Sequence, residues 1–118
     1  MLQRGDDLKM PAEMLLVLTI ILREGERLDH LSRLSERVYD WLAIGPAERQ
    51  IIAAELQLYD ARISSAASIL ALRALAQAER STVARQVLDF ASGDPLLASH
   101  LRRLRIRVLD ILALDEPI

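Results

Sequence analysis

The sequence predicts an all-α fold, an array of antiparallel helical hairpins closed by a C-terminal capping helix. Three observations lead to this fold class. Apolar residues recur at steps of three and four, which is the period of an amphipathic helix. No segment alternates apolar and polar residues, and no Asn-Gly or Asp-Gly pair suggests a turn between strands. Proline and glycine stand at intervals that fit helix starts and helix ends.

The composition indicates one domain with an aliphatic core. The chain has 118 residues, of which 52% are hydrophobic. Its aromatic residues are Tyr39, Trp41, Tyr59 and Phe90. A chain of this length suits one domain. We expect a single helical domain over 11–114, with disordered tails over 1–10 and 115–118.

Six helices are expected along the chain, and the links between them are short. The predicted spans are 11–24, 27–43, 46–59, 61–77, 81–91 and 95–114. The first is apolar almost all round, and the others each have one apolar stripe. The boundary between the fourth and fifth is the least marked, because residues 78–80 also favour helix. Short links make sequential helices pack antiparallel.

Proline, glycine and one aspartate mark the expected helix ends. Pro11, Pro46 and Pro95 each fit the first position of a helix, where the missing N–H has no partner to lose. Asp94 is the expected N-cap of the last helix. The glycines at the expected helix ends are Gly25, Gly45 and Gly93.

Charge, cysteine content and hydropathy exclude several classes of protein. The net charge is -2 at pH 7, so the chain as a whole has no positive charge to attract nucleic acid. It contains no cysteine, which excludes a disulfide scaffold and a thiolate metal site. The apolar segment 14–22 is too short to span a bilayer. Asp6 and Asp7 precede it and no cleavage site follows, which argues against a signal peptide. We expect a cytoplasmic protein without a membrane span.

No pattern of residues predicts catalysis, a cofactor or a metal. His30 and His100 are far apart in the sequence, whereas a metal site needs three or four convergent donors. Ser64, Ser65 and Ser68 have no base nearby. The chain has no glycine-rich phosphate loop, HExxH or GxSxG motif. We therefore expect no enzyme activity, no catalytic residue, no cofactor and no bound metal.

Four arginines lie close together in the last predicted helix: Arg102, Arg103, Arg105 and Arg107. Leu101, Leu104 and Val108 take the inward face of this helix, so the arginines spread over the outward face. Two interpretations stay open. The arginines form either a solvated face or a docking surface for an acidic partner.

Residues 50–69 resemble a helix-turn-helix motif. Apolar residues fall where such motifs keep them, at Ala53, Leu56, Leu58 and Ile63. Gln57 stands in place of the usual turn glycine. The second helix offers few basic side chains for phosphate contact. A DNA-binding regulator, acting as a dimer on duplex DNA, is an alternative function.

The overlapping segment 47–70 also fits a tetratricopeptide-like hairpin, because small side chains let two helix backbones approach closely. The small residues of this segment are Ala53, Ala54, Ala61, Ala66 and Ala67, with Ala61 in the tight turn. One such hairpin cannot bury its face alone, so neighbours must stack on it. The chain contains no clean second copy of this segment.

Two segments of the chain resemble parts of a known family, the larger, tetratricopeptide-like chaperone of type III secretion needle subunits. Residues 36–42 resemble the family's second helix, which ends in Trp-Leu after a start that contains a histidine, here His30. Gly45, Glu48 and the hairpin 51–67 resemble its second repeat.

A third segment continues the resemblance in the right order. Residues 92–98 resemble the Ser-x-Asp-Pro opening of the family's capping helix, and Arg105 and Val108 extend the match. The family has a fuller third repeat, and this chain is shorter there. The resemblance implies a chaperone that holds a small amphipathic secretion subunit monomeric in the cytoplasm, with a second small helical chaperone docked on it. Such a chaperone binds the subunit's apolar helix in a concave groove.

The function expected from the sequence is that of a protein-binding chaperone or adaptor. We expect its groove on the first helices of two hairpins, lined by Leu15, Leu18, Leu22, Ile52, Leu56 and Tyr59. The alternative interpretation makes these six residues ordinary core. A further alternative function is a structural homo-oligomer, in which the first or the last helix packs against its own copy.

Overall fold

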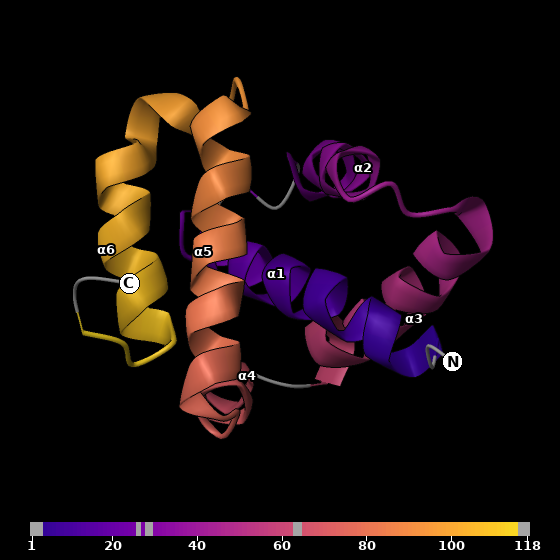
Figure 1. Ribbon diagram of the computed structural model, residues 1–118, viewed down its shortest axis with the longest axis horizontal. Helices are drawn as coiled ribbons and strands as arrows, with labels where there is room; N and C mark the ends of the chain where they lie inside the picture. The colour runs from indigo at the N-terminus through magenta and orange to yellow at the C-terminus, as the bar shows by residue number, and fades with distance from the viewer. Residues whose placement is uncertain (1–3, 26, 28–29, 63–64, 116–118) are drawn as a thin grey trace. The chain divides into compact units, whose positions relative to one another are not determined.

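The computed structural model describes the backbone of residues 4–25, 27, 30–62 and 65–115, and within them the side chains of all but 4–9, 55–62 and 65. All regular structure in this part of the chain is helical (Figure 1). The elements are α1 (Arg4–Glu24), α2 (Leu31–Trp41), α3 (Pro46–Arg62), α4 (Ser65–Arg73), α5 (Gln77–Gly93), the 3-10 helix η2 (Ala98–His100) and α6 (Leu101–Ile111). The predicted all-α class is confirmed.

The chain divides into two compact units, residues 1–68 and 69–118. In the first unit, α2 and α3 both pack against α1 (Figure 1). Residues 14–18 of α1 are buried at every position, as expected of a helix that is apolar all round. Leu34 and Val38 of α2 lie one turn apart on its buried stripe, and α3 buries Ile52. The single domain predicted over 11–114 stays a prediction.

α1 begins earlier than its sequence predicts. Residues 4–10 are helical, so the predicted start of the helix at Pro11 is wrong, whereas the disordered tail over 1–10 stays a prediction. Pro11 lies inside the helix, where its ring removes one backbone hydrogen bond. Leucine, methionine and lysine all favour helix and surround the proline at Leu8, Lys9, Met10 and Met14. The helix therefore continues past Pro11, although the proline cannot donate its backbone hydrogen bond.

In the second unit, α5 and α6 pack side by side as an antiparallel hairpin (Figure 1). Arg80, in the first turn of α5, donates hydrogen bonds to carbonyls that follow the end of α6, which fixes the antiparallel direction. Val83 and Val87 of α5 and Leu104 and Val108 of α6 are buried. The contact is therefore built from aliphatic side chains spaced one helical turn apart, as the sequence predicts.

The last helix begins later than predicted because Asp94 acts on a different element. Its carboxylate accepts hydrogen bonds from the backbone N–H of Leu96 at 3.0 Å and of Leu97 at 3.2 Å. Asp94 therefore caps the turn that follows α5, and Pro95 lies in this turn. η2 comes next, and α6 begins only at Leu101 instead of residue 95.

Other predicted boundaries differ by a few residues. α2 begins at Leu31 instead of residue 27, and the N–H of His30, just before it, donates to the carbonyl of Arg27. α4 ends at Arg73, and α5 already begins at Gln77, so residues 78–80 belong to the fifth helix. The start of α3 at Pro46 is as predicted.

The turn expected inside 47–70 is absent from the described backbone. α3 is unbroken from Pro46 to Arg62, so Gln57 and Ala61 both lie within a helix. The turn positions predicted at Gln57 and Ala61 are therefore wrong, and the helix-turn-helix over 50–69 stays a prediction because residues 63–64 lie outside the described part of the chain. Neither glycine nor proline interrupts this stretch, so nothing in it stops a helix. Ile63 lies outside the described residues.

The chain contains an internal repeat that relates α2 to α6. Segments 30–44 and 100–114 align without a gap, and more than half of their positions are identical. The identical pairs are His30/His100, Leu31/Leu101, Arg33/Arg103, Leu34/Leu104, Arg37/Arg107, Val38/Val108, Asp40/Asp110, Leu42/Leu112 and Ala43/Ala113. Each segment forms a helix of 11 residues. The two copies thus have the same length, and the pairs Leu34/Leu104 and Val38/Val108 are buried in both.

Both copies also end in the same unusual way, on an alanine. Ala43 has φ 57° and Ala113 has φ 53°, the left-handed conformation in which glycine is usual. The next residue returns its N–H to the helix in each copy, from Ile44 to the carbonyl of Tyr39 and from Leu114 to that of Leu109, both at 2.9 Å. These bonds define a Schellman motif at each end.

Replacing Ala43 by glycine is expected to stabilise the first unit. A left-handed conformation is unfavourable for a residue with a Cβ, and glycine removes that penalty at the expense of a more flexible unfolded chain. We expect a net gain of about 1 kcal/mol in the free energy of unfolding, measured by urea denaturation. The control is Ala53→Gly, at an exposed position inside α3. It should lose about 1 kcal/mol, and losses in both variants would contradict the prediction.

Candidate protein-binding surfaces

Four of the six predicted groove residues are buried in the structure. Leu15 and Ile52 are 0% exposed, Leu18 is 1% exposed and Leu22 is 6% exposed. These four buried side chains line no open groove in this structure, which favours their alternative interpretation as core, and the groove itself stays a prediction. The side chains of Leu56 and Tyr59 lie outside the described residues.

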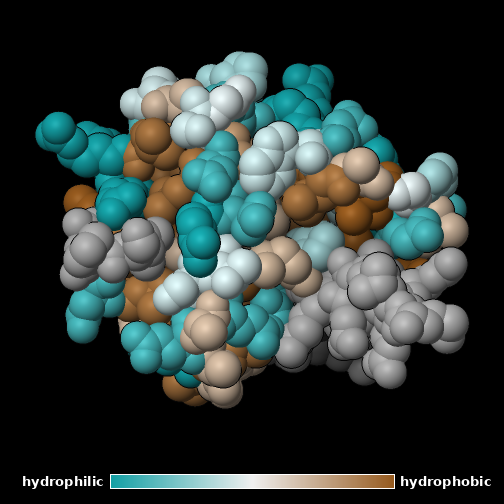
Figure 2. Space-filling model, in the orientation of Figure 1, coloured by the Kyte–Doolittle hydropathy of each residue, from teal (hydrophilic) through white to brown (hydrophobic). Residues whose placement is uncertain are grey.

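Large apolar side chains that are exposed lie elsewhere. In the first unit Trp41 is 45% and Ile51 is 47% exposed; in the second, Leu70 is 67% and Ile106 is 64% exposed. On the face shown in Figure 2, brown apolar surface breaks the hydrophilic surface in several separate places. Aromatic and aliphatic residues of this kind supply the core of protein interfaces. Of the four, Ile106 stands among the arginines of the last helix.

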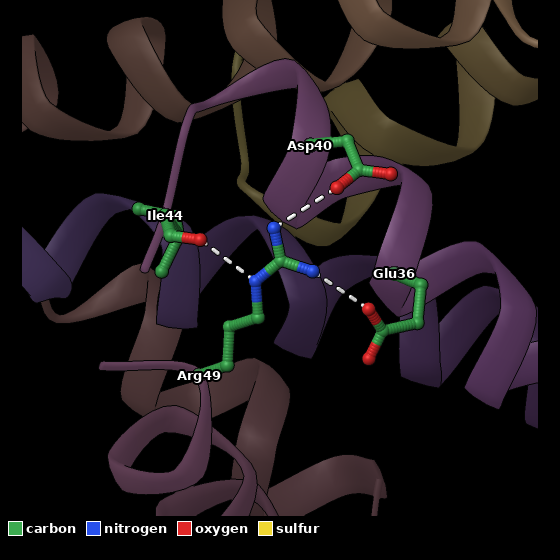
Figure 3. A network of polar contacts seen from close by, with 4 residues as sticks. All are labelled: Glu36, Asp40, Ile44 and Arg49. Atoms are coloured by element: carbon green, nitrogen blue, oxygen red, sulfur yellow. Dashed lines mark hydrogen bonds and ion pairs between the residues drawn. The ribbon is translucent and has the colours of Figure 1, made fainter. Parts of the chain in front are cut away.

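Arg49 joins the start of α3 to the exposed face of α2 (Figure 3). Its Nε donates to the carbonyl oxygen of Ile44 at 2.7 Å. Its Nη atoms bind Glu36 at 2.7 Å and Asp40 at 2.9 Å. Glu36 and Asp40 are four residues apart, so they project from the same side of α2. The guanidinium also lies 5.3 Å from the centre of the Tyr39 ring. Arg49 thus anchors one helix on the acidic side of another.

The electrostatics of this network suit a structural role. The hydrogen bond that Arg49 donates to Asp40 is the largest cause that raises the pKa of Arg49, so the cation is held charged. Burial of the Tyr39 ring raises the pKa of its hydroxyl, and Glu36 raises it further, whereas Arg49 lowers it. A phenol with a raised pKa stays neutral and is a weak acid. The network therefore joins the two helices through a charged guanidinium beside a neutral phenol.

Because the fold raises the pKa of Tyr39, we expect the free energy of unfolding to depend on pH. In the unfolded chain a tyrosine has a pKa of about 10, and in the fold the value is higher, so the folded state holds the proton more tightly. This stability is present below pH 10 or so and is lost as the pH rises through the folded-state pKa. Urea denaturation at a series of alkaline pH values should show the free energy of unfolding decreasing as the pH rises. Tyr39→Phe should reduce its slope, and an unchanged slope in that variant would contradict the assignment.

The outer face of α6 is basic with an apolar centre. Arg102 and Arg103 are exposed, as the sequence predicts, and Ile106 lies one turn further along. Arg105 and Arg107 are only half-exposed, and Arg107 pairs with Asp110. We call Arg102, Arg103, Ile106 and Asp110 the α6 face. In the part of Figure 2 that corresponds to α6 in Figure 1, brown and teal surface alternate.

A hollow lies beside this face. It has a volume of about 280 Å³ and is lined by Ser99, His100, Arg102 and Arg103. All four residues belong to η2 and the start of α6, so the hollow is a feature of the second unit alone. Hydroxyl, imidazole and guanidinium groups are hydrogen-bond donors suited to a carboxylate.

The opposite end of α6 is occupied by two arginines of the same unit. Arg73 donates to the carbonyls of Asp110 at 2.7 Å and Ile111 at 3.1 Å. Arg80 donates to those of Leu112 at 2.9 Å and Ala113 at 3.1 Å. The last carbonyls of a helix have no partners within it, and cations there are favourable. No pattern in the sequence predicts these contacts.

Neither a metal-binding cluster nor a membrane-spanning helix is found in the described part of the chain. Within it, no group of three His, Asp or Glu side chains is placed to hold a metal ion. None of its helices is both long enough and apolar enough to cross a membrane. No known protein family, no curated protein and no solved structure matches the chain.

Proposed function

We propose that this chain is a protein-binding chaperone or adaptor that works in the cytoplasm as a short, tetratricopeptide-like array of helical hairpins. The observation that carries the proposal is the internal repeat. The copies 30–44 and 100–114 share sequence, helix length, burial and helix-end geometry. Repeated helices are the building units of solenoid arrays, whose extended surfaces typically bind other proteins.

The partner that we propose is a small helical protein. Exposed aliphatic and aromatic side chains lie on several helices, and helical repeats bind amphipathic helices through such residues. The resemblance to needle-subunit chaperones names a candidate class, a secretion subunit that must be kept monomeric, with a second small chaperone on the same protein. The two copies of the repeat include residues that carry this resemblance, among them 36–42, Arg105 and Val108.

The test is recovery of the affinity-tagged chain from its own host, followed by native mass spectrometry of the complex. We expect an equimolar complex with one small helical protein, with or without a second small chaperone. The same tag on an unrelated helical protein is the control. Recovery of the chain only with copies of itself would contradict the proposal and support the structural homo-oligomer.

A further inference from the structure

We propose that the α6 face docks an acidic amphipathic helix of the partner protein. This inference rests on the proposed function and names the surface and the chemistry of the partner. The internal repeat supports this proposal, because the equivalent face of α2 binds a charged side chain from another helix.

On α2, that face binds a side chain from another helix. Glu36 and Asp40 bind Arg49, in the first turn of α3 (Figure 3). The equivalent residues on α6 are Ile106 and Asp110. Ile106 is 64% exposed, and the side chain of Glu36 stays 61% exposed beside Arg49, so both positions are open to a partner. The α6 face therefore corresponds in position to a surface that binds a charged side chain from a neighbouring helix.

The two copies differ in charge on this side. Ser32, Ser35 and Glu36 of α2 correspond to Arg102, Arg105 and Ile106 of α6. The copy that binds an arginine is thus neutral to acidic, and the other copy is basic. The inward-facing leucine and valine one turn apart stay buried in both. Charge complementarity then selects an acidic partner, where α2 selects a basic one.

The geometry specifies the partner further. An aliphatic side chain on the incoming helix would pack on Ile106, and carboxylates near it would reach Arg102 and Arg103. The adjacent hollow, lined by Ser99 and His100 as well as these arginines, has room for a carboxylate. Hydrogen bonds between guanidinium and carboxylate groups are stronger than neutral ones and fix orientation. The exposed arginines would also accelerate encounter with an acidic helix.

The test uses two synthetic helical peptides and fluorescence anisotropy on the whole chain. One peptide carries a leucine flanked by glutamates one turn away on each side. The other has lysines in place of those glutamates. We expect the acidic peptide to bind at least about tenfold more tightly than the basic one, with affinity falling as salt rises.

Three variants locate the binding surface. Ile106→Asp and the double variant Arg102→Glu with Arg103→Glu should each weaken binding of the acidic peptide by about tenfold or more. The matched control is Arg33→Glu, at the exposed position of α2 that is equivalent to Arg103. It should leave the affinity unchanged. All the substituted residues are exposed, and circular dichroism checks that each variant is folded.

Equal affinity for the two peptides, or full binding by Ile106→Asp, would overturn this inference. The proposed function fails in a different way, by the absence of any partner protein from the native host. If the host partner is recovered equally by the wild-type chain and by Ile106→Asp, the α6 face is not its docking site, and the proposed function stands.

Discussion

Leu18→Asp is expected to unfold the first unit. Leu18 is 1% exposed and lies in the run of buried residues 14–18 at the centre of α1, against which both α2 and α3 pack. Aspartate removes an aliphatic side chain from this core and places a carboxylate there without water. Loss of the apolar contacts and burial of the charge together should lower the free energy of unfolding by more than about 4 kcal/mol. That is a large part of the stability of a small domain.

The measurement is a comparison with Ile51→Asp by circular dichroism and urea denaturation. Ile51 is 47% exposed, so its replacement should leave the unit folded. The comparison also decides between groove and core for helix α1. If Leu18→Asp were as stable as the wild-type chain and lost only its partner, Leu18 would be a groove residue after all.

Arg80→Ala is expected to destabilise the second unit. The guanidinium of Arg80 binds the carbonyls of Leu75, Leu112 and Ala113, at 2.9 to 3.1 Å. Without it, the carbonyls after α6 lose a charged donor in a partly buried place, and the start of α5 is no longer joined to the end of α6. We expect a loss of about 2 kcal/mol in the free energy of unfolding.

Arg85→Ala is the matched control for this effect. Arg85 lies on α5 as well, but its side chain is exposed. Its replacement should change the free energy of unfolding by less than about 0.5 kcal/mol, as is usual for exposed sites. Equal effects of the two substitutions would show that Arg80 contributes only helix propensity. The stabilising role of its hydrogen bonds to the carbonyls after α6 would then be wrong.

The fold class and most of the core could be predicted from the sequence because helical periodicity is a local property. Leu34 and Val38 on one helix, and Leu104 and Val108 on another, are spaced by one turn and are buried as that spacing predicts. Pro46 at the start of α3 is equally local. Helix ends depended on contacts that no window of sequence displays. Asp94 caps a turn instead of α6, and an alanine takes the place of the expected glycine after α2.

The candidate binding surfaces were harder to predict from the sequence than the fold. A helix such as α1, apolar on all sides, carries no sign of which side faces a neighbour, so Leu15 and Leu22 could not be assigned to groove or core. The outward direction of Arg102 followed from helical periodicity and is confirmed. The role of Arg49 depends on a contact between two helices, which periodicity within one helix does not display. The signal that relates α2 to α6 is the identity between residues 30–44 and 100–114, which an alignment of the chain with itself detects.

The central claim, that this chain holds another protein, is tested most directly by a photo-crosslinking amino acid placed at Ile106 and expressed in the native host. The same amino acid at Arg33, on the exposed side of the other copy of the repeat, is the control. We predict one crosslinked species from position 106, between the chain and a different small protein rich in acidic residues, and none to that protein from position 33. Crosslinks only between copies of the chain, or the same products from both positions, would contradict the account.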